Sequence, residues 1–290
     1  MRRQPLPCLR LRDRTFTWGD RTYIMGILNV TPDSFSDGGD HYGVEFAVNG
    51  GIRLAEAGAD IIDIGGQSTR PGAETIALSE ELDRVIPVIE TLRSRLDLPI
   101  SIDTTRSEVA KAALAAGADI INDISGGTFE PEILAIAAKF NAPIVLMHLR
   151  GTPQTMQSLT DYEDLMGEIG QFLGDRLAAA VDAGCDANKI IIDPGIGFAK
   201  TGQQNLTILR ELDKLRSLNC PILVGPSRKS FIGRILQQDD PKQRLFGTAA
   251  ACTAAIAASA DIIRVHDVRE MSDVCRVADA IFRDSELRLS

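Results

Sequence analysis

The sequence has few of the residues from which zinc sites and disulfide frameworks are built. It contains three histidines and five cysteines among 290 residues. The cysteines are scattered and odd in number, and no pair has the spacing of a zinc site, so we expect reduced thiols in a cytoplasmic protein. The histidines lie too far apart in the sequence to suggest a zinc site by their spacing.

Long apolar runs and an excess of positive charge are also missing. No uninterrupted apolar stretch approaches the roughly 20 residues that a membrane span needs. The arginines near the start are not followed by the apolar segment of a secretory signal. The net charge is -9 and the sequence pI is about 5.0. This negative charge argues against a surface that binds nucleic acid or an anionic membrane, but it is compatible with a locally basic pocket.

One phrase recurs along the chain and carries most of the information on the fold. Residues 57–64 read AGADIIDI, residues 116–124 read AGADIINDI and residues 258–267 read ASADIIRVHD. Each phrase passes from small residues into a short apolar burst without polar alternation, which is typical of a strand buried on both faces. Because helical stretches separate the copies, the pattern predicts parallel strands joined by crossover helices.

The full pattern predicts eight strands and one barrel. The expected strands cover residues 23–28, 61–64, 100–103, 120–123, 144–148, 190–193, 222–225 and 262–266. The predicted fold class is therefore α/β, a single (β/α)8 TIM barrel, which typically takes about 250 residues. No linker divides the pattern, so we expect one catalytic domain over residues 23–285. A hairpin extension over residues 1–22 should precede it and turn at Gly19 and Asp20.

Polar side chains stand where the predicted strands end, and a barrel of this kind does its chemistry at those carboxyl ends. Carboxylate and amide groups suit a flat heterocycle that presents N–H donors and ring acceptors. These groups are Asp103, Asn122 and Asp193. Cationic groups with a further amide suit phosphate oxygens. These are Arg70, Lys229, Arg264 and His266, with Asn29.

Two loops on the same face are long for connections between a strand and a helix, which normally take about 2 to 6 residues. They cover residues 30–43 and 65–76 and are rich in Gly, Ser, Pro and Asp. Loops in this position commonly act as lids or substrate grips.

Several polar residues also have a purely structural interpretation. An aspartate at a strand end is as often a helix cap, which applies most to Asp63 and Asp123. His148 could be a satisfied core histidine. The segment GIGFAKT has two glycines, but Lys200 stands where a dinucleotide fingerprint needs its third. Any metal is expected to be a hard cation such as Mg²⁺, held by substrate phosphate oxygens, water and one side-chain oxygen.

Eight motifs carry a resemblance to a known family. They are MGILNVTPDSFSDGG (25–39), IDIGGQSTRPGA (62–73), SIDTTR (101–106), IINDISGG (120–127), MHLRGTPQTMQ (147–157), IIDPGIGFAKT (191–201), GPSRKSFIG (225–233) and IIRVHDV (262–268). In this order they resemble the dihydropteroate synthase family over nearly the whole chain. The first and seventh motifs are the most specific.

The resemblance implies a TIM-barrel transferase with Mg²⁺ as cofactor. It would condense 6-hydroxymethyl-7,8-dihydropterin diphosphate with 4-aminobenzoate to give 7,8-dihydropteroate and diphosphate in folate synthesis. The implied pterin site is Asp103, Asn122, Met147, Asp193, Gly225, Lys229 and Arg264. The implied diphosphate site is Asn29, Thr69, Arg70, Arg264 and His266, with Asn29 also touching Mg²⁺. The implied aminobenzoate site is Thr69, Pro71, Phe198, Ser227 and Lys229. The implied catalytic residues are Asp103, Lys229, Arg264 and His266.

Three positions depart from the family pattern without removing an implied site residue. Gln67 stands where Glu is more usual, Ala199 replaces a Gly, and Pro226 takes the place of a small apolar residue. The resemblance also implies a homodimer that acts on small molecules, with neither nucleic acid nor a membrane as a partner. Two alternatives stay open: a pterin barrel that transfers methyl groups with a folate and a corrinoid, and a homologue that binds pterins without catalysis.

Overall fold

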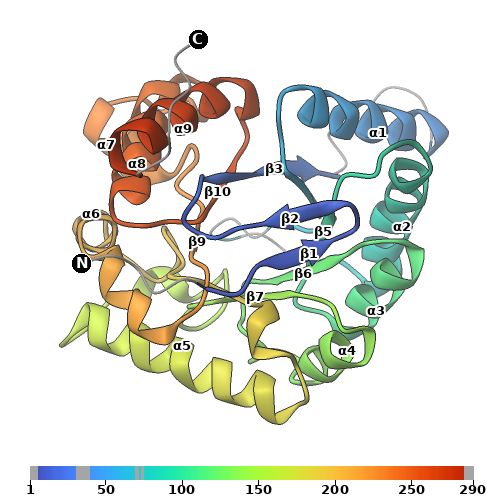
Figure 1. Cartoon of the computed structure of the whole chain (residues 1–290), viewed down its shortest axis with the longest axis horizontal. Helices are drawn as coiled ribbons and strands as arrows, with labels where there is room; N and C mark the ends of the chain where they lie inside the picture. Colours follow the sequence, from blue (N-terminus) through green and yellow to red (C-terminus); the bar gives the residue numbers. More distant parts are fainter. Residues whose placement is uncertain (1–5, 31–39, 69–71, 73–74, 284–290) are drawn as a thin grey trace.

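Eight parallel strands form the centre of the molecule (Figure 1). The computed structural model describes residues 6–30, 40–68, 72 and 75–283. The strands are β3 (Tyr23–Asn29), β4 (Ile61–Gly65), β5 (Ile100–Asp103), β6 (Ile120–Asp123), β7 (Ile144–Met147), β8 (Ile190–Asp193), β9 (Leu223–Val224) and β10 (Ile262–Val265). All of the predicted strands are confirmed, with small shifts at their ends.

The strands form a nearly closed barrel. Their order is β8-β7-β6-β5-β4-β3-β10-β9, and a parallel bridge between Ile192 and Ile222 connects the two ends of this order. The strand residues are mostly apolar because side chains fill the barrel interior and helices cover its outer face. The predicted α/β TIM-barrel fold is therefore confirmed.

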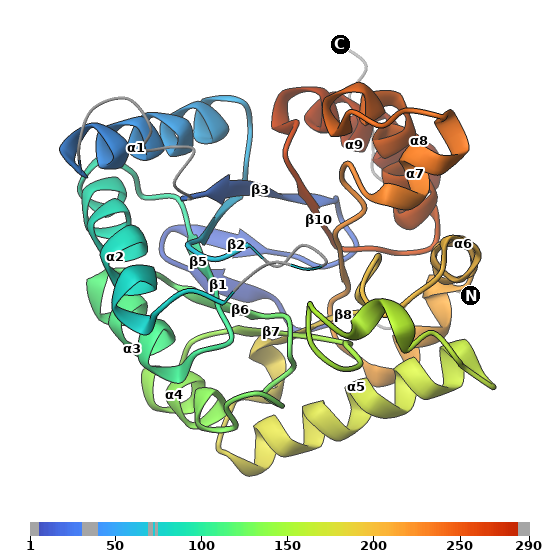
Figure 2. The same cartoon turned by 180° about the vertical axis from the view of Figure 1, so that it is seen from behind.

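Helices connect the strands and surround the barrel, which Figure 2 shows from the opposite side. They are α1 (Asp40–Glu56), α2 (Leu78–Arg95), α3 (Ser107–Ala116), α4 (Glu132–Phe140), α5 (Leu165–Asp182), α6 (Gly202–Arg210), α7 (Ser230–Leu236), α8 (Leu245–Ala257) and α9 (Val268–Phe282). Short 3-10 helices are η2 (Met156–Ser158), η3 (Ala187–Lys189), η4 (Leu212–Leu218) and η5 (Pro241–Arg244). No helix in the described ranges combines the length and apolar character needed to cross a bilayer.

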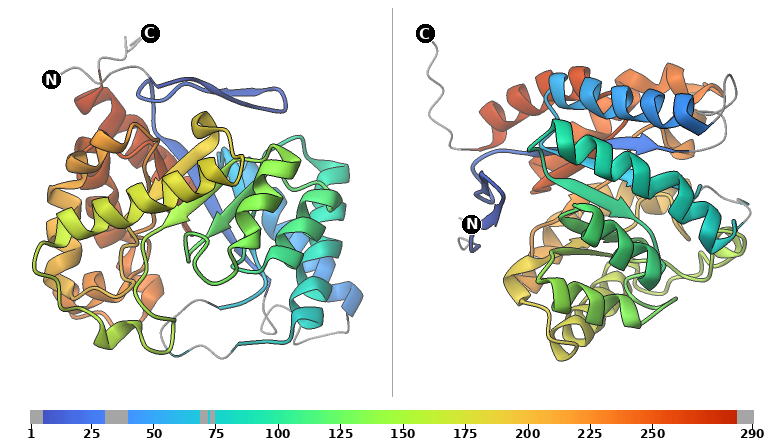
Figure 3. Two further views of the ribbon diagram at one scale, coloured as in Figure 1. Left: turned by 90° about the horizontal axis from the view of Figure 1, so that it is seen from below. Right: turned by 90° about the vertical axis from the view of Figure 1, so that its right-hand side faces the viewer.

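An antiparallel hairpin covers one end of the barrel (Figures 1 and 3). It pairs β1 (Leu9–Leu11) with β2 (Arg14–Phe16). Phe16 and Trp18 pack in one cluster with residues from the amino ends of the strands, such as Tyr23. The hairpin therefore seals the barrel at the end opposite to the carboxyl ends of its strands.

The predicted turn of this hairpin is wrong. The chain reverses between β1 and β2 at Arg12, which takes a left-handed backbone conformation with φ 56. The guanidinium of Arg12 donates to Asp119 at 2.8 Å, and this contact anchors the turn on the barrel. A turn at Gly19 and Asp20 also exists, but it follows the hairpin and leads into β3.

The strand register brings the polar strand ends together. Asp103 on β5 lies opposite Asn122 on β6, while Gly65 on β4 lies opposite Asp103 on its other side. Farther round the barrel, Met147 on β7 lies opposite Asp193 on β8. Side chains that are far apart in the sequence therefore meet at one mouth, as expected for a barrel.

Candidate active site

A buried ion network occupies the carboxyl end of the barrel. Arg264 on β10 donates from Nε to Asp63 Oδ2 and from Nη2 to Asp103 Oδ2, each at 2.6 Å. Asn122 donates from Nδ2 to the same Asp63 oxygen at 3.0 Å. Four strands therefore contribute to one network, in which a single guanidinium binds two carboxylates.

The network leaves carboxylate oxygens available for a ligand. Oδ1 of Asp63 and Oδ1 of Asp103 are buried and have no hydrogen-bond partner among the described residues. A buried acceptor without a donor is costly, so such atoms indicate a ligand that supplies N–H groups. Burial raises the pKa of Asp103; the positive charge of Arg264 opposes this shift, and the negative charge of Asp63 adds to it.

Asp193 forms the second acidic point of the site. It ends β8 with only 6% of its surface exposed, and its Oδ1 accepts from the Gly195 N–H at 2.7 Å. Burial raises the pKa of Asp193 to about 6, while the Gly195 hydrogen bond and the charges of Lys229 and Lys200 oppose the rise. An acid in this position is an anion at neutral pH and can accept from a heterocycle.

Apolar side chains line the space between these acids. Met147, Ile124 and Phe198 belong to one small buried cluster at the mouth. Lys229 places its Nζ 4.1 Å from the centroid of the Phe198 ring, a cation–π contact. The site thus combines apolar side chains with a few polar groups, the usual composition of a small-molecule site.

Basic and hydroxyl groups lie between β9 and β10. Ser227 Oγ is 3.0 Å from His266 Nδ1 and accepts from the His266 backbone N–H at 3.2 Å. Arg228 forms a two-point ion pair with Asp267, and its backbone N–H donates to Thr248 Oγ1 at 3.0 Å. These contacts fix the segment that presents Ser227 beside His266.

Comparisons with known proteins assign the family. The pterin binding enzyme family matches residues 25–266. A dihydropteroate synthase from Synechocystis is 61% identical over 277 residues, 96% of this chain and 96% of that protein. Its counterpart from Xanthomonas albilineans, solved with 4-aminobenzoic acid, has a TM-score of 0.88 at 46% identity, covering 95% of this chain and 98% of that chain. A structure of the Xanthomonas protein with 7,8-dihydropteroate has a TM-score of 0.85 at 44% identity, with 95% and 98% covered.

The chain belongs to the dihydropteroate synthase family. The predicted resemblance is therefore confirmed, and with it the expectation of a transferase enzyme of folate synthesis. The roles of individual residues are predictions, and the structure gives the position of each described one.

Most of the site residues expected for a dihydropteroate synthase lie at the mouth of the barrel. Asp103, Asn122 and Arg264 share the ion network, and Asp193, Met147, Phe198 and Lys229 lie around the neighbouring strands. Gly225 follows β9, and a Cβ placed there would lie 3.7 Å from the Arg264 Cβ. Asn29 ends β3 with its surface exposed. Thr69, Arg70 and Pro71 lie outside the described residues, as do residues 31–39, 73 and 74 of the two predicted lid loops.

One residue of the network was missed by sequence reasoning. The helix-cap interpretation does not hold for Asp123, whose carboxylate accepts from the backbone N–H groups of Ser125 and Gly127 in the turn after β6, well before α4 begins at Glu132. It is also wrong for Asp63, which is completely buried and binds Arg264 and Asn122. A signal was present in the repeated phrase, because Asp63, Asn122 and Arg264 occupy the same position in its copies.

Two of the departures from the family pattern have visible structural effects. Ala199 takes a left-handed conformation with φ 50, which glycine adopts without strain and alanine does not. Its carbonyl accepts from the Tyr162 hydroxyl at 3.0 Å, which holds the strained residue in place. Oε1 of Gln67 is buried without a partner among the described residues.

Proposed function

We propose that this enzyme condenses 6-hydroxymethyl-7,8-dihydropterin diphosphate with 4-aminobenzoate to form 7,8-dihydropteroate and diphosphate. The observation that carries the proposal is the network of Asp63, Asp103, Asn122 and Arg264, with its unpaired carboxylate oxygens at the mouth of the barrel. The structures of the Xanthomonas family member with 4-aminobenzoic acid and with 7,8-dihydropteroate support the same pair of ligands.

The pterin would bind between the acidic groups. Asp103 and Asp193 would accept hydrogen bonds from its N–H donors, and Asn122 would contact its ring atoms. Arg264 would lie along the ring while remaining paired with both carboxylates. Because these groups are buried, their hydrogen bonds to a ligand act in a low dielectric and are stronger than in water.

Chemistry would begin with departure of diphosphate. Its negative charge would be stabilised by Arg70, Arg264 and His266. The bond between the methylene carbon and the diphosphate oxygen breaks, and its electron pair leaves with diphosphate. The resulting cation is conjugated with the pterin ring, and the Asp103 carboxylate stabilises it. The arylamine then attacks the methylene carbon and loses a proton, so no covalent enzyme intermediate is required.

Mg²⁺ is the proposed cofactor, with Asn29 as its protein ligand. No group of three or more histidine, cysteine, aspartate or glutamate residues in the described ranges is placed to hold a metal ion. A side-chain oxygen at the exposed end of β3 fits a cation that keeps water ligands and binds mainly through substrate phosphate. When bound, Mg²⁺ would neutralise charge on the leaving diphosphate.

A product assay tests the function and its metal dependence together. With both substrates and Mg²⁺, we expect stoichiometric 7,8-dihydropteroate and diphosphate, measured by chromatography and phosphate release. Removal of Mg²⁺ with a chelator should lower the rate by at least about tenfold, since several kcal/mol of charge stabilisation are lost. Readdition of Mg²⁺ should restore it.

Three outcomes of this assay would contradict the proposal. An absence of condensation, together with methyl transfer when a methylated folate and a corrinoid are supplied instead, would favour the corrinoid-dependent alternative. Pterin binding without product would favour a non-catalytic homologue. An unchanged rate after metal removal would exclude the proposed use of Mg²⁺.

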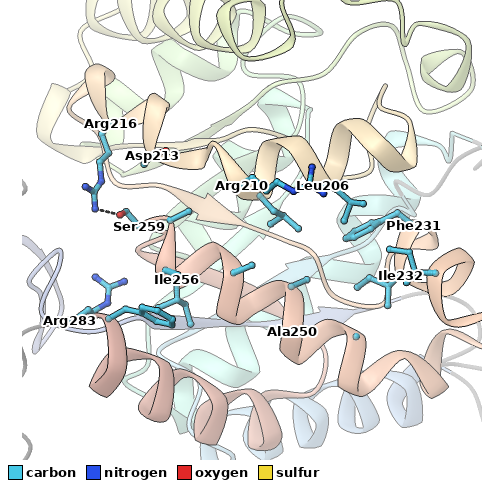
Figure 4. Close-up of a pocket in the computed structure, with 18 of the residues that line it drawn as sticks. Leu206, Arg210, Asp213, Arg216, Phe231, Ile232, Ala250, Ile256, Ser259 and Arg283 are labelled. Carbon is cyan, nitrogen blue, oxygen red and sulfur yellow. Dashed lines mark hydrogen bonds between the residues drawn. The ribbon is translucent and has the colours of Figure 1, made fainter. Parts of the chain in front are cut away.

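The location and assembly are also proposed. All five cysteines are free thiols, which suits the reducing cytoplasm. A groove of about 1160 Å³ lies between α6, η4, α7, α8 and the end of α9 (Figure 4). Its wall is largely apolar, including Ile232, Ala250 and Ile256. Large apolar residues beside it are exposed, among them Ile235 at 59% and Phe246 at 85%.

This face is the proposed interface of a homodimer, because exposed apolar side chains of this size are typical of interfaces. Phe246→Asp should convert a dimer into a monomer while the barrel stays folded, since this side chain is exposed. Sedimentation velocity measures the change. Val181→Asp on α5, 44% exposed, is the matched control and should remain dimeric. A monomeric wild-type protein, or a dimeric Phe246→Asp variant, would contradict this assignment.

A further inference from the structure

A lysine lies buried behind the site, outside the set of residues implied to touch substrate. Lys200 precedes α6 and is only 4% exposed. Its Nζ donates to the Phe198 carbonyl at 2.8 Å and lies 2.9 Å from His148 Nδ1. Lysine is rarely buried to this degree without a specific partner. Burial of this amino group costs free energy, so we ask which function of Lys200 offsets that cost.

The contact with His148 defines the protonation of both groups. An ammonium group only donates, so Nδ1 of His148 accepts and the neutral ring carries its proton on Nε2. Burial, with the charges of Lys200 and Arg150, lowers the pKa of His148 to about 2, so the ring stays neutral. Its ring also packs edge-on against Phe172 of α5, with the centroids 4.9 Å apart. His148 is thus a fixed acceptor at the end of β7.

The loop that carries Lys200 is packed tightly against this end of β7. Gly195 has φ 71, and a Cβ there would lie 2.1 Å from the His148 carbonyl oxygen, so only glycine fits. The loop also holds Gly197 and Ala199 in left-handed conformations. Such a chain needs specific anchors. Lys200 supplies one of them, because it joins the Phe198 carbonyl to His148.

The charge of Lys200 acts on the acid that ends β8. A Cβ placed on Gly195 would lie 3.3 Å from Lys200 Nζ, and the backbone N–H of Gly195 donates to Asp193 Oδ1 at 2.7 Å, so the lysine lies close to this carboxylate. Asp193 is the acid that acts on Lys200, while Lys229 from the segment after β9 and Arg150 from the segment after β7 are the cations that act on it. Burial lowers the pKa of Lys200 to about 7, and Asp193 opposes this, so Lys200 is mainly an ammonium in the more acidic range where Asp193, with a pKa of about 6, titrates. Conversely, the positive charges of Lys229, Lys200 and Arg264 lower the pKa of Asp193 against the effect of burial.

We propose that Lys200 is a positioning residue of the reaction. It holds Phe198 against Lys229 through the loop backbone, and it provides a positive charge behind Asp193 that keeps this acid ionised for the pterin. The inference rests on the proposed function, because it takes Phe198 and Asp193 as substrate contacts.

Two variants distinguish the anchoring contacts of Lys200 from the effect of its positive charge. Lys200→Met removes both, whereas Lys200→Gln removes the charge and keeps an N–H donor for Phe198 and His148. Lys111→Met, on the exposed side of α3, is the matched control. The measurements are the KM of each substrate, kcat, the pH profile of kcat/KM and the thermal midpoint of the holoenzyme with Mg²⁺.

Loss of the contacts by which Lys200 anchors the loop should change the KM for aminobenzoate. We expect Lys200→Met to raise it by about tenfold or more, because a small displacement of a positioning group has effects of this size. Lys200→Gln should raise it less. Loss of the charge should change the pH profile of kcat/KM for the pterin substrate. Without Lys200 the pKa of Asp193 rises, so the acidic limb of this profile moves to higher pH in both variants.

The outcomes distinguish this inference from the proposed function. A lower thermal midpoint with unchanged KM values and an unchanged pH profile would assign Lys200 a merely structural role and overturn the inference, while the function stands. A shift of the same size in Lys111→Met would overturn it as well. If the wild-type protein forms no dihydropteroate, the function itself fails.

Discussion

Replacing Asp103 by asparagine is expected to lower turnover by about 100- to 1000-fold, the range found when one preorganised electrostatic group is lost from a site. The carboxylate would face the cation that forms when diphosphate leaves, and a neutral amide cannot balance that charge. The ion pair with Arg264 would also be lost, although Asp63 still holds the guanidinium at its Nε. Rapid-quench measurement of product formation reports the chemical step directly.

The same substitution should leave the fold intact. Burial raises the pKa of Asp103 above its value in the unfolded chain. For an acid whose pKa is raised in the folded state, ionisation favours unfolding as the pH rises through the unfolded value of about 4. The amide removes this effect, which offsets the lost ion pair with Arg264, so the barrel should stay folded with at most a small fall in the thermal midpoint at neutral pH. A near wild-type rate in Asp103→Asn would contradict the role of this carboxylate.

Asp119→Asn provides the opposite pattern and serves as the control. Asp119 accepts from Arg93 at 2.6 Å and from the Ile100 backbone N–H at 2.9 Å, at the amino end of the barrel. Its loss should lower stability and leave kcat per folded molecule unchanged. A fall in kcat equal to that of Asp103→Asn would mean that such assays report damage to the barrel rather than chemistry.

The barrel can be predicted well from the sequence because the same structural contact is encoded in each copy of the repeated phrase. The aspartate just before the apolar burst of each phrase accepts from a backbone N–H group at the start of a neighbouring strand. Asp60 binds the N–H of Ile24, and Asp261 binds that of Ile222, both at 2.9 Å. Together with Asp119, these residues show one structural device used in all copies. Local patterns of this kind can be detected without knowledge of the rest of the chain.

The site is harder to predict because its residues depend on partners far away in the sequence. Asp63 and Arg264 are 201 positions apart, and β4 lies near β10 only because the last strand, β10, pairs with the first strand of the barrel, β3. Sequence alone could not separate a cap from an ion pair at Asp63, since both use the same carboxylate. The turn at Arg12 was missed for a similar reason, because a contact with Asp119 stabilises it.

Asparagine in place of Asp63 should impair both stability and catalysis. Asp63 is completely buried, and its Oδ2 accepts from both Arg264 and Asn122. Breaking a buried charge pair commonly costs about 3 to 5 kcal/mol, because the remaining charge loses its partner. Here Asp103 retains one contact with Arg264, so we expect a loss at the lower end of this range. The free energy of unfolding, measured in urea, should fall by about 3 kcal/mol.

The catalytic effect of Asp63→Asn comes through its two partners. The amide oxygen can take the place of Oδ2, but a neutral acceptor holds the Arg264 guanidinium less strongly than a carboxylate, so both Arg264 and Asn122 would shift from the orientation that the pterin requires. We expect kcat/KM for the pterin substrate to fall by about 100-fold, whereas the aminobenzoate KM should change little. The control is Asp60→Asn, at the residue just before β4. It removes a buried carboxylate that binds Arg21 and the Ile24 backbone N–H, and it should lower stability without changing kcat/KM. If both variants lost stability equally and neither changed kcat/KM, Asp63 would be a second structural aspartate, and Asp103 alone would orient Arg264.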